Sequence, residues 1–380
     1  MNSADALEAG RVVEVPVRAG EGRLDYRVLV GSGLLGRLPA LIRKHAPAHR
    51  YALVADSNVT VLYGRRALQE MVEAGLACEL LTFPAGEESK SRTVWSELTD
   101  AMLGAGVGRD GAVLALGGGV TGDLAGFVAA TYLRGVPVVQ LPTSLVAMMD
   151  SAVGGKTGVD VPAGKNLVGA FHPPRLVVVD PRTVATLPRT ERAQGLVEAI
   201  KHGAIMDVHY LSRLERDLNA LLEGDPSSIG TAVLRSVEIK AQVVSDDERE
   251  AGPREMLNFG HTLGHALEAQ AGYRVPHGTA VAIGMILEAR LGEVLGVTAL
   301  GTSERLERLM ARLELSLAPP GPEGTQEVLA YLRSDKKTRR GRARFVLLKA
   351  LGRVARGERW SHEVKETAVA GVLERWSAGT

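Results

Sequence analysis

The chain has 380 residues, of which 45% are hydrophobic and 4% aromatic, and its 45 basic and 44 acidic side chains leave a net charge of +1. This length suffices for about two domains, while the balanced charge and the few aromatic side chains argue against a nucleic-acid-binding surface. The single cysteine, Cys78, excludes an internal disulfide, and we find neither a secretory signal nor an apolar run of the roughly 20 residues that span a membrane, so we expect a cytoplasmic protein that does not bind membranes.

The first half of the chain alternates short β-rich runs with helical patterns. Several runs are almost continuously apolar, which indicates strands that are covered on both faces. The candidate strands are Val12–Val17, Tyr26–Val30, Tyr51–Ala55, Cys78–Phe83, Ala112–Leu116, Val136–Leu141 and Leu176–Val179. The helix-like stretches between them include Gly36–Lys44, Leu62–Ala74 and Thr93–Leu103. We therefore predict a domain over residues 1–188 that is built on a largely parallel α/β sheet.

Polar or glycine-rich segments follow three of these strands. Asp56 ends the third strand, where it suits either a ribose hydroxyl or a turn. Pro84–Lys90 follows the fourth strand and is either a ligand-binding segment or a solvated loop. After the fifth strand, Gly117, Gly119 and Gly122 satisfy G-x-G-x-x-G at the start of a helix, where backbone N–H groups can bind a diphosphate. The acidic residue that usually follows about 20 positions later is missing, so the standard Rossmann fingerprint is incomplete.

Two lysines and an asparagine lie among glycines between Gly154 and Phe171, as Lys156, Lys165 and Asn166. Glycine lets the backbone approach a ligand closely and lysine adds a compact charge, so this stretch suits a phosphate or a carboxylate. It does not match the Walker pattern G-x-x-x-x-G-K-[ST]. The alternative is a glycine-rich loop whose lysines are merely solvated.

From Thr190 onward the pattern becomes mainly helical, and we predict a second domain over residues 189–380. The predicted helices are Glu191–Ile205, Val208–Leu222, Ile229–Val244, His261–Ala271, Ala280–Leu295, Ser303–Leu313 and Glu363–Arg375. Arg342–Leu348 and Arg353–Glu358 are predicted to form a short hairpin before the last helix.

Metal-ligating residue types gather in this second half. His261 and His265 are spaced i and i+4 on one helix face, and His277 follows where another helix begins. Glu198 is acidic on an otherwise apolar helical face. Two imidazoles and one carboxylate leave a coordination position open, as in catalytic zinc sites, although the histidines could instead be helix caps or packed polar side chains. His-Glu-x-x-His is absent, so a zincin protease has no support.

Motifs spread from about Asp56 to Leu348 resemble the 3-dehydroquinate synthase family, which belongs to the sugar-phosphate cyclases. These motifs are G-G-G-V-T-G-D, Q-L-P-T-S, D-S-A-V-G-G-K-T-G, G-K-N-L-V-G-A-F, T-L-P, E-A-I-K-H-G, N-F-G-H-T-L-G-H-A-L-E, H-G-T-A-V-A-I-G-M and D-K-K. The resemblance implies an α/β N-terminal, Rossmann-like NAD-binding domain followed by a mainly α-helical C-terminal metal-binding domain. It also implies a homodimer.

The resemblance further implies roles for single residues. A zinc or cobalt ion would be bound by Glu198, His261 and His277, with His265 as an acid-base or substrate contact. NAD would be bound by Asp56, Glu87, Lys90, Gly118, Gly119, Asp123, Thr143, Ser144, Lys156, Lys165, Thr183 and Thr186. Catalytic and substrate contacts would be Asp150, Lys156, Asn166, Lys201, Lys240, Arg254, Asn258 and Lys337, or Lys336 in place of Lys337, together with Arg134 of the partner subunit.

Three positions depart from the pattern of the family. Ser144 replaces the more usual threonine and keeps the hydroxyl, and Ala152 replaces a common serine. Asp160 stands where asparagine is usual, which adds negative charge near an anionic substrate.

The implied reaction converts 3-deoxy-D-arabino-heptulosonate 7-phosphate to 3-dehydroquinate and phosphate, by transient oxidation with NAD, phosphate elimination, re-reduction and intramolecular aldol closure. Three alternatives remain open at the level of sequence. A metal-dependent polyol dehydrogenase would release NADH, another sugar-phosphate cyclase would make a different carbocycle, and a regulatory protein would bind NAD and metal without turnover.

Overall fold

The computed structural model describes residues 3–8, 10–19, 24–318, 321–334, 343–357 and 359–378. The chain divides into two compact units. The first comprises Met1–Leu187 and Gly224–Glu248, and the second comprises Pro188–Glu223 and Arg249–Thr380. The predicted boundary at residue 188 lies beside the end of the first segment, whereas the sequence pattern placed residues 224–248 in the helical domain.

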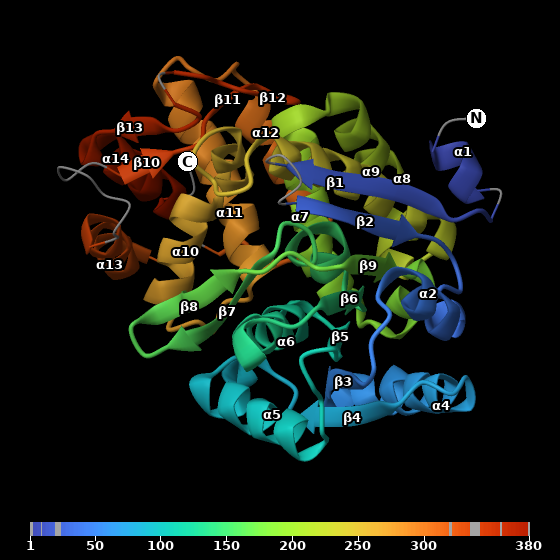
Figure 1. The fold of residues 1–380 in the computed structure, drawn as a ribbon. Helices are drawn as coiled ribbons and strands as arrows, with labels where there is room; N and C mark the ends of the chain where they lie inside the picture. The colour runs from blue at the N-terminus through green and yellow to red at the C-terminus, as the bar shows by residue number, and fades with distance from the viewer. Residues whose placement is uncertain are drawn as a thin grey trace. The chain divides into compact units, whose positions relative to one another are not determined.

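A seven-stranded sheet forms the centre of the first unit (Figure 1). Its strand order is β1-β2-β9-β6-β5-β3-β4, and all neighbouring pairs are parallel except β1–β2. The strands are β1 (Val13–Ala19), β2 (Leu24–Val30), β3 (Tyr51–Asp56), β4 (Cys78–Phe83), β5 (Ala112–Gly117), β6 (Val138–Pro142) and β9 (Leu176–Val179). The predicted, largely parallel α/β sheet is therefore confirmed, with each of its seven strands.

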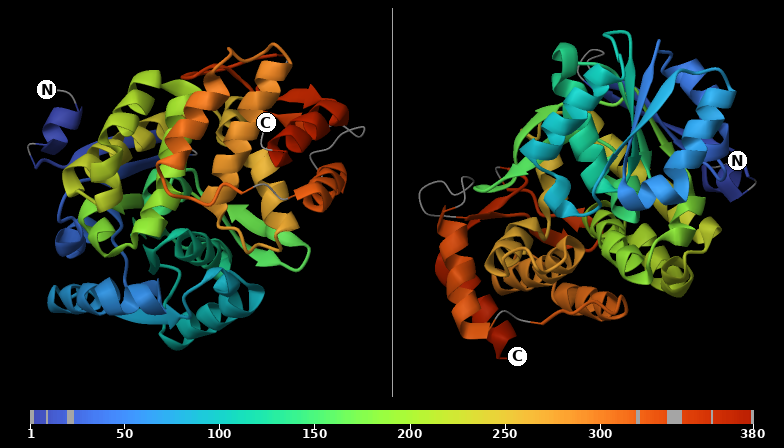
Figure 2. Two further views of the ribbon diagram at one scale, coloured as in Figure 1. Left: turned by 180° about the vertical axis from the view of Figure 1, so that it is seen from behind. Right: turned by 90° about the horizontal axis from the view of Figure 1, so that it is seen from below.

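Helices cover both faces of this sheet (Figures 1 and 2). The helices of the first unit are α1 (Ser3–Glu8), α2 (Leu38–His45), α3 (Ser57–Val59), α4 (Arg65–Glu73), α5 (Arg92–Gly104), α6 (Gly119–Thr131) and α9 (Pro226–Asp246). Successive side chains of a strand point to opposite faces, so Leu53 packs in a core with α2 and α4, while Val54 packs with α5 and α6. Burial on both faces explains the continuous apolar runs of β3, β5, β6 and β9.

Helix α9 belongs to the first unit although it follows two helices of the second. It packs against β1 and β2, and the Arg18 N–H donates to Ser245 Oγ over 3.1 Å. Asp225 caps its N-terminus by accepting a hydrogen bond of 2.8 Å from the Ser228 N–H. The sequence pattern predicted this helix but carried no information about which unit it packs on.

The glycine-rich stretch after Gly154 is a β-hairpin rather than the loop that its composition suggests. Strand β7 (Lys156–Val161) pairs antiparallel with β8 (Gly164–Phe171), and the hairpin packs beside α6. Glycine is required at Gly169, where the two paired strands lie close together, because a Cβ there would lie 2.1 Å from Thr157 O. These glycines therefore permit strand pairing and close packing.

The second unit is mainly helical. Its helices are α7 (Arg189–Met206), α8 (Val208–Glu223), α10 (His261–Gln270), α11 (His277–Val294), α12 (Thr302–Ala311), α13 (Gly321–Ser334) and α14 (Glu366–Ser377). Apolar side chains of α10, α11, α13 and α14 form one core. Every helix predicted in this half is present, and α13 is an additional helix that the sequence pattern did not indicate. The mainly helical C-terminal domain is thus confirmed.

The C-terminal strands pair differently from the predicted hairpin. Strand β11 (Leu348–Ala350) pairs with β12 (Arg353–Val354), so the predicted hairpin is present only near its turn, and β10 (Ala343–Phe345) pairs instead with β13 (His362–Val364). The prediction considered only neighbouring segments, and the β10–β13 pairing joins segments that β11 and β12 separate in sequence. Arg342 and Glu358 at the ends of the predicted strands lie outside the described residues.

Candidate functional site

The strand order of the first unit reverses between β3 and β5. The chain passes from β3 to β4 on one side and then places β5, β6 and β9 on the other. Open α/β sheets bind ligands at the carboxyl ends of the strands beside such a reversal. Asp56 ends β3 and Gly118 directly follows β5, so both predicted cofactor residues lie at this edge.

The glycines after β5 leave space at the start of α6. The helix begins at Gly119, and its first turn offers backbone N–H groups to an anion. A Cβ at Gly117 would lie 2.2 Å from Thr121 Oγ1, and one at Gly118 would lie 3.3 Å from Ser144 Oγ. Larger side chains here would fill the cradle that a diphosphate needs.

Asp56 also caps the short helix α3. Its Oδ1 accepts hydrogen bonds from the Asn58 N–H over 2.9 Å and the Val59 N–H over 3.0 Å. The turn-forming role that the sequence left open is thus present. Because both bonds use one oxygen, they do not occupy the second, Oδ2.

Four predicted cofactor residues form two ion pairs in the first unit. Lys90 Nζ lies 2.6 Å from Asp123 Oδ2, and Lys165 Nζ lies 3.4 Å from Glu87 Oε1. Burial lowers the pKa of Lys90, but the charge and hydrogen bond of Asp123 outweigh it, so the pKa is raised and the ammonium is retained. The pairs connect the segment after β4 to α6 and to β8.

The predicted hydroxyl residues follow β6 and β9. Thr143 is buried directly after β6, and Ser144 is the next residue. Thr183 is also buried, and its hydroxyl donates to Asp180 O over 2.9 Å. Thr186 is exposed, and its Oγ1 lies 2.6 Å from the hydroxyl oxygen of Tyr63. Of these two residues after β9, Thr186 is therefore the more accessible to a ligand.

Asp150 and Lys240 form a close pair within the first unit. Lys240 Nζ donates to both the backbone O and the Oδ1 of Asp150, each over 2.5 Å. Lys240 is buried on α9, and Asp150 lies in the helical turn Ala147–Ser151. The structure thus brings together two predicted catalytic residues that are far apart in sequence.

The hairpin separates Lys156 from Asn166. Lys156 pairs with Phe171 at the base of the hairpin. Asn166 lies five residues before Phe171 on β8, and five strand residues span roughly 16 Å. Asn166 has a left-handed backbone with φ +56°, and its N–H donates to Asp160 Oδ1 over 2.8 Å. Asp160 thus has a local function in holding the turn.

Arg134 lies in a strained segment at the end of α6. Leu133, Arg134 and Gly135 have consecutive positive φ values of 51°, 71° and 115°. Non-glycine residues held in this region cost free energy, which is typical of functional segments. The Arg134 side chain is exposed.

The three predicted metal ligands converge in the second unit. Glu198 lies on α7, and His261 and His277 are the first residues of α10 and α11. Nε2 of His261 and Nε2 of His277 each lie 3.8 Å from Glu198 Oε1. Two ligands about 2.1 Å from a tetrahedral metal are roughly 3.4 Å apart, so the donor atoms fit one ion.

The electrostatics of the cluster favour the neutral form of the His261 imidazole. Burial, aided by the charge of Lys201, holds the pKa of His261 well below its usual range. Burial also lowers the pKa of His277, but the hydrogen bond and charge of Glu268 outweigh it and raise that pKa. Lys201 is buried and forms an ion pair with Glu198 one turn away on α7.

The remaining predicted residues of this unit lie on α10 and in the segment before it. His265 is exposed, and its ring centroid lies 5.4 Å from that of His261 and 6.0 Å from that of His277. Arg254 is buried, and Asn258 Nδ2 donates to Glu250 Oε1 over 2.5 Å. Lys336 and Lys337 lie outside the described residues.

Three polar side chains around the cluster were not predicted from the sequence. Gln194, Glu268 and Glu288 each hydrogen-bond a ligand or the start of a ligand-bearing helix. Glu268 and Glu288 are buried on helical faces that are otherwise apolar, which is the same signal that singled out Glu198.

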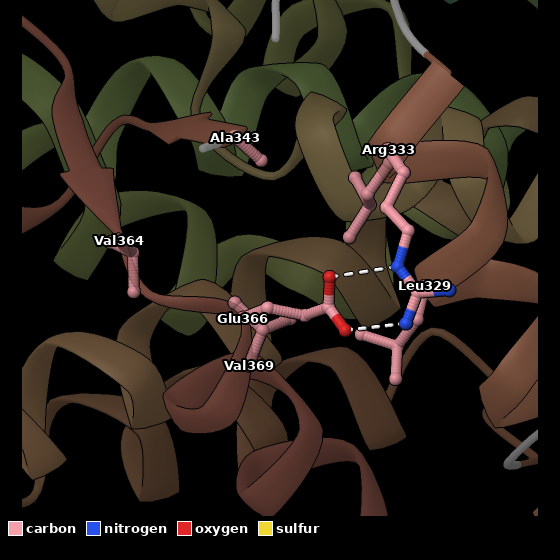
Figure 3. Close-up of a pocket in the computed structure, with 7 residues that line it drawn as sticks. Leu329, Arg333, Ala343, Val364, Glu366 and Val369 are labelled. Atoms are coloured by element: carbon pink, nitrogen blue, oxygen red, sulfur yellow. Dashed lines mark hydrogen bonds and ion pairs between the residues drawn. The ribbon is translucent and has the colours of Figure 1, made fainter. Parts of the chain in front are cut away.

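A small pocket lies near the C-terminus between α13, β10, β13 and α14 (Figure 3). Its lining is apolar except for Arg333 and Glu366, which face each other across two hydrogen bonds of 2.8 and 2.5 Å. The pocket contains none of the predicted site residues, so we do not consider it the functional site.

Among the described residues, no helix has the length and apolar character needed to cross a membrane.

Comparison with known proteins gives consistent matches. The family models described as 3-dehydroquinate synthase N-terminal and 3-dehydroquinate synthase C-terminal match residues 80–194 and 195–338. A relative from Symbiobacterium thermophilum, named 3-dehydroquinate synthase, is 48% identical over 86% of this chain and 92% of its own.

Two solved structures resemble the whole chain. The 2-epi-5-epi-valiolone synthase from Streptomyces hygroscopicus subsp. jinggangensis 5008, with NAD+ and Zn2+ bound, has a TM-score of 0.85 and 28% identity over 95% of this chain and 99% of its own. A 2-deoxy-scyllo-inosose synthase complexed with carbaglucose-6-phosphate, NAD+ and Co2+ has a TM-score of 0.85 and 25% identity over 96% of this chain and 99% of its own.

Proposed function

This chain belongs to the 3-dehydroquinate synthase family, and from that premise we propose that it converts 3-deoxy-D-arabino-heptulosonate 7-phosphate to 3-dehydroquinate and phosphate. This is a carbon–oxygen lyase reaction of the shikimate route to aromatic amino acids. The identity of 48% to a synthase of this name, against 25% and 28% to cyclases with other products, favours this carbocycle.

The convergence of Glu198, His261 and His277 is the observation that carries the proposal. One carboxylate and two imidazoles are the donor set of a catalytic zinc site with an open position. These three side chains would hold one zinc or cobalt ion in the domain of residues 189–380. When bound, the metal supplies Lewis-acid polarisation of a substrate hydroxyl, and NAD supplies reversible hydride acceptance.

The domain of residues 1–188 would bind the NAD. The start of α6 receives the diphosphate, and Asp56 offers its carboxylate to a ribose hydroxyl. The Lys90–Asp123 and Lys165–Glu87 pairs hold charged groups in place beside this edge of the sheet. The full set is Asp56, Glu87, Lys90, Gly118, Gly119, Asp123, Thr143, Ser144, Lys156, Lys165, Thr183 and Thr186.

The substrate is a phosphorylated sugar acid, and cationic and polar side chains bind its two anionic groups. In the first unit these are Lys156, Asn166 and Lys240, and in the second they are Lys201, Arg254, Asn258 and Lys337. Asp150 is anionic, so its proposed catalytic role is not to bind these groups but to hold Lys240. Buried Lys240 is held by Asp150, so its charge has a fixed direction. Such fixed charges and hydrogen bonds contribute through orientation and electrostatic stabilisation.

His265 is the acid-base candidate of the second unit. It is exposed beside the rings of His261 and His277, and an imidazole can carry a proton near neutral pH. Its role is to move a proton to or from the substrate.

The protein would act in the cytoplasm as a homodimer, with Arg134 of the partner subunit as a further substrate contact. The strained backbone at this residue is consistent with a side chain that is presented outward.

A turnover assay tests the proposal. Metal-loaded protein is incubated with the heptulosonate phosphate and a substoichiometric amount of NAD, and phosphate, dehydroquinate and NADH are followed together. We expect one phosphate and one dehydroquinate per substrate, without accumulation of NADH. Accumulating NADH would indicate a dehydrogenase. A different carbocyclic product would indicate another sugar-phosphate cyclase. Binding of NAD and metal without turnover would indicate a regulatory protein.

A further inference from the structure

Both histidines of the metal cluster use Nδ1 for a hydrogen bond within the protein. His277 Nδ1 lies 3.2 Å from Glu268 Oε2, and His261 Nδ1 lies 3.2 Å from the backbone O of Phe259. An ionised carboxylate and a carbonyl only accept hydrogen bonds, so each Nδ1 carries the proton. In the neutral ring, the lone pair is then on Nε2, the nitrogen that faces Glu198.

Glu268 is buried, with 1% of its surface exposed. It lies on α10 seven residues after His261, which is two helical turns along the same face. One helix therefore supplies a ligand and, two turns later, the carboxylate that contacts the ligand of another helix. Burying a carboxylate costs free energy unless the group is paired and hydrogen-bonded, which makes the contact with His277 important.

Two more side chains, Glu288 and Gln194, align the helices without touching a ligand side chain. Glu288 on α11 accepts hydrogen bonds from the Gly260 N–H over 2.7 Å and the Leu263 N–H over 3.2 Å, at the start of α10. Gln194 on α7 accepts from the Thr279 N–H over 2.8 Å, at the start of α11. These contacts act on the backbone, whereas Glu268 acts on the imidazole itself.

Glu268 could in principle be a ligand, because His265, Glu268 and His277 also bring donor atoms within 4.8 Å of one another. That set would need the exposed His265 and would replace the existing contact between Glu268 and His277 Nδ1. In the other set, both Nε2 atoms face Glu198 while both Nδ1 atoms keep their partners. The geometry therefore favours Glu268 as a partner of the ligand.

Resting on the metal site of the proposed function, we propose that Glu268 is a positioning residue that fixes the tautomer and ring direction of His277 for metal binding. Carboxylates behind a metal-bound histidine raise its basicity and set its orientation, and their loss typically weakens metal binding about 10- to 100-fold. Glu268→Ala removes this contact. Glu268→Gln keeps an oxygen that accepts from Nδ1 but removes the charge.

The test measures zinc affinity by competition with a chelator, together with the visible spectrum of the cobalt(II)-loaded protein. We expect about 10- to 100-fold weaker binding for Glu268→Ala, partial recovery for Glu268→Gln, and a cobalt spectrum that changes in Glu268→Ala more than in Glu268→Gln. Glu327→Gln, at an exposed glutamate of α13, is the matched control and should bind as the unchanged protein does.

Thermal unfolding of the metal-free variants separates positioning from loss of structure. Glu288→Gln should lower the unfolding temperature because it weakens the hydrogen bonds at the start of α10. Glu268→Gln should lower zinc affinity with a smaller change in unfolding temperature.

Two results would overturn the positioning role. Unchanged zinc affinity in both Glu268 variants would show that the contact has no effect on the metal, and a loss as complete as in Glu198→Ala would make Glu268 a ligand. If the unchanged protein binds neither ion, the proposed metal centre itself fails, and the positioning role fails with it.

Discussion

The two candidate sites of this chain are built in different ways. The part of the proposed NAD site that would bind the diphosphate is formed by backbone, at the carboxyl end of β5 and the start of α6 in the first unit. The metal cluster of the second unit is formed by side chains from three helices, each held by further buried polar groups. A backbone site tolerates most changes except those that fill its space, whereas a side-chain site depends on each donor.

The largest expected effect is the loss of a metal ligand. Glu198→Ala should abolish zinc and cobalt binding and lower turnover by at least about a thousandfold, because a Lewis acid contributes several kcal/mol. Metal analysis after dialysis and the turnover assay measure both effects. Glu191→Ala, an exposed glutamate of the same helix, is the control. A Glu198→Ala protein that retained one tightly bound ion would contradict the role of Glu198 as a metal ligand.

A chelator provides a reversible version of this change. Removing the metal from the unchanged protein should abolish turnover, and added zinc or cobalt should restore it. Full activity in metal-free protein would contradict the proposed ligands.

Lys156 separates substrate binding from cofactor binding in the first unit. We expect Lys156→Ala to lower kcat/KM about 100-fold while the Kd for NAD changes much less, because the proposed main role of this charge is to bind an anionic group of the substrate. Calorimetric titration of NAD and steady-state kinetics provide the two values. Lys44→Ala, at an exposed lysine of α2, should change neither. Equal losses of kcat/KM and NAD affinity would exclude a substrate role for Lys156.

Gly118 tests whether open space defines the NAD site. In Gly118→Val, the new side chain would begin 3.3 Å from Ser144 Oγ and obstruct the start of α6. We expect NAD affinity to fall about tenfold or more, with unchanged metal affinity in the other unit. Gly104→Ala is the control, because nothing lies within 4 Å of its Cβ. Unchanged NAD binding in Gly118→Val would place the diphosphate elsewhere.

The smallest expected effect concerns the stability of the first unit and tests the N-cap of α9. Asp225→Ala removes the N-cap of this helix and should cost about 1 kcal/mol at neutral pH. The hydrogen bond from the Ser228 N–H lowers the pKa of Asp225 below its ordinary value in the folded chain. Its contribution is therefore fully present above that value and is lost as the pH falls through the lower, folded pKa.

Denaturant unfolding of Asp225→Ala and Asp225→Asn at several pH values measures this contribution. Asparagine also caps helices, so Asp225→Asn should lose less stability than Asp225→Ala and show little dependence on pH at this position. A difference between the unchanged protein and Asp225→Ala that persists at the lowest pH would contradict the capping role.

The α/β sheet was predictable because burial on both faces leaves a local signal. Short β-rich runs identified every strand of the sheet, and several of these runs, such as Leu176–Val179, are continuously apolar. The β7–β8 hairpin was not predicted, because glycines such as Gly158 and Gly169 usually indicate loops. Here they allow the strands to approach, which depends on the partner strand and not on local sequence.

Spacing and context indicated a group of candidate metal ligands, whereas the choice of His277 over His265 came from the family resemblance, and the partners of the ligands were not predicted. His261 and His265 at i and i+4, and Glu198 on an apolar face, are local signals. Glu268 and Glu288 carry the same kind of signal, but their roles depend on which helix lies opposite. The membership of α9 in the first unit was hidden for the same reason, since the choice of packing partner is a tertiary property.

The most direct test of the proposed metal centre is X-ray absorption at the cobalt edge of the cobalt(II)-loaded protein. Convergence of Glu198, His261 and His277 predicts one ion with two imidazole nitrogens and at least one carboxylate oxygen, and without sulfur. A spectrum with fewer than two imidazoles, or one that remained unchanged in Glu198→Ala, would contradict the metal centre on which the proposed chemistry depends.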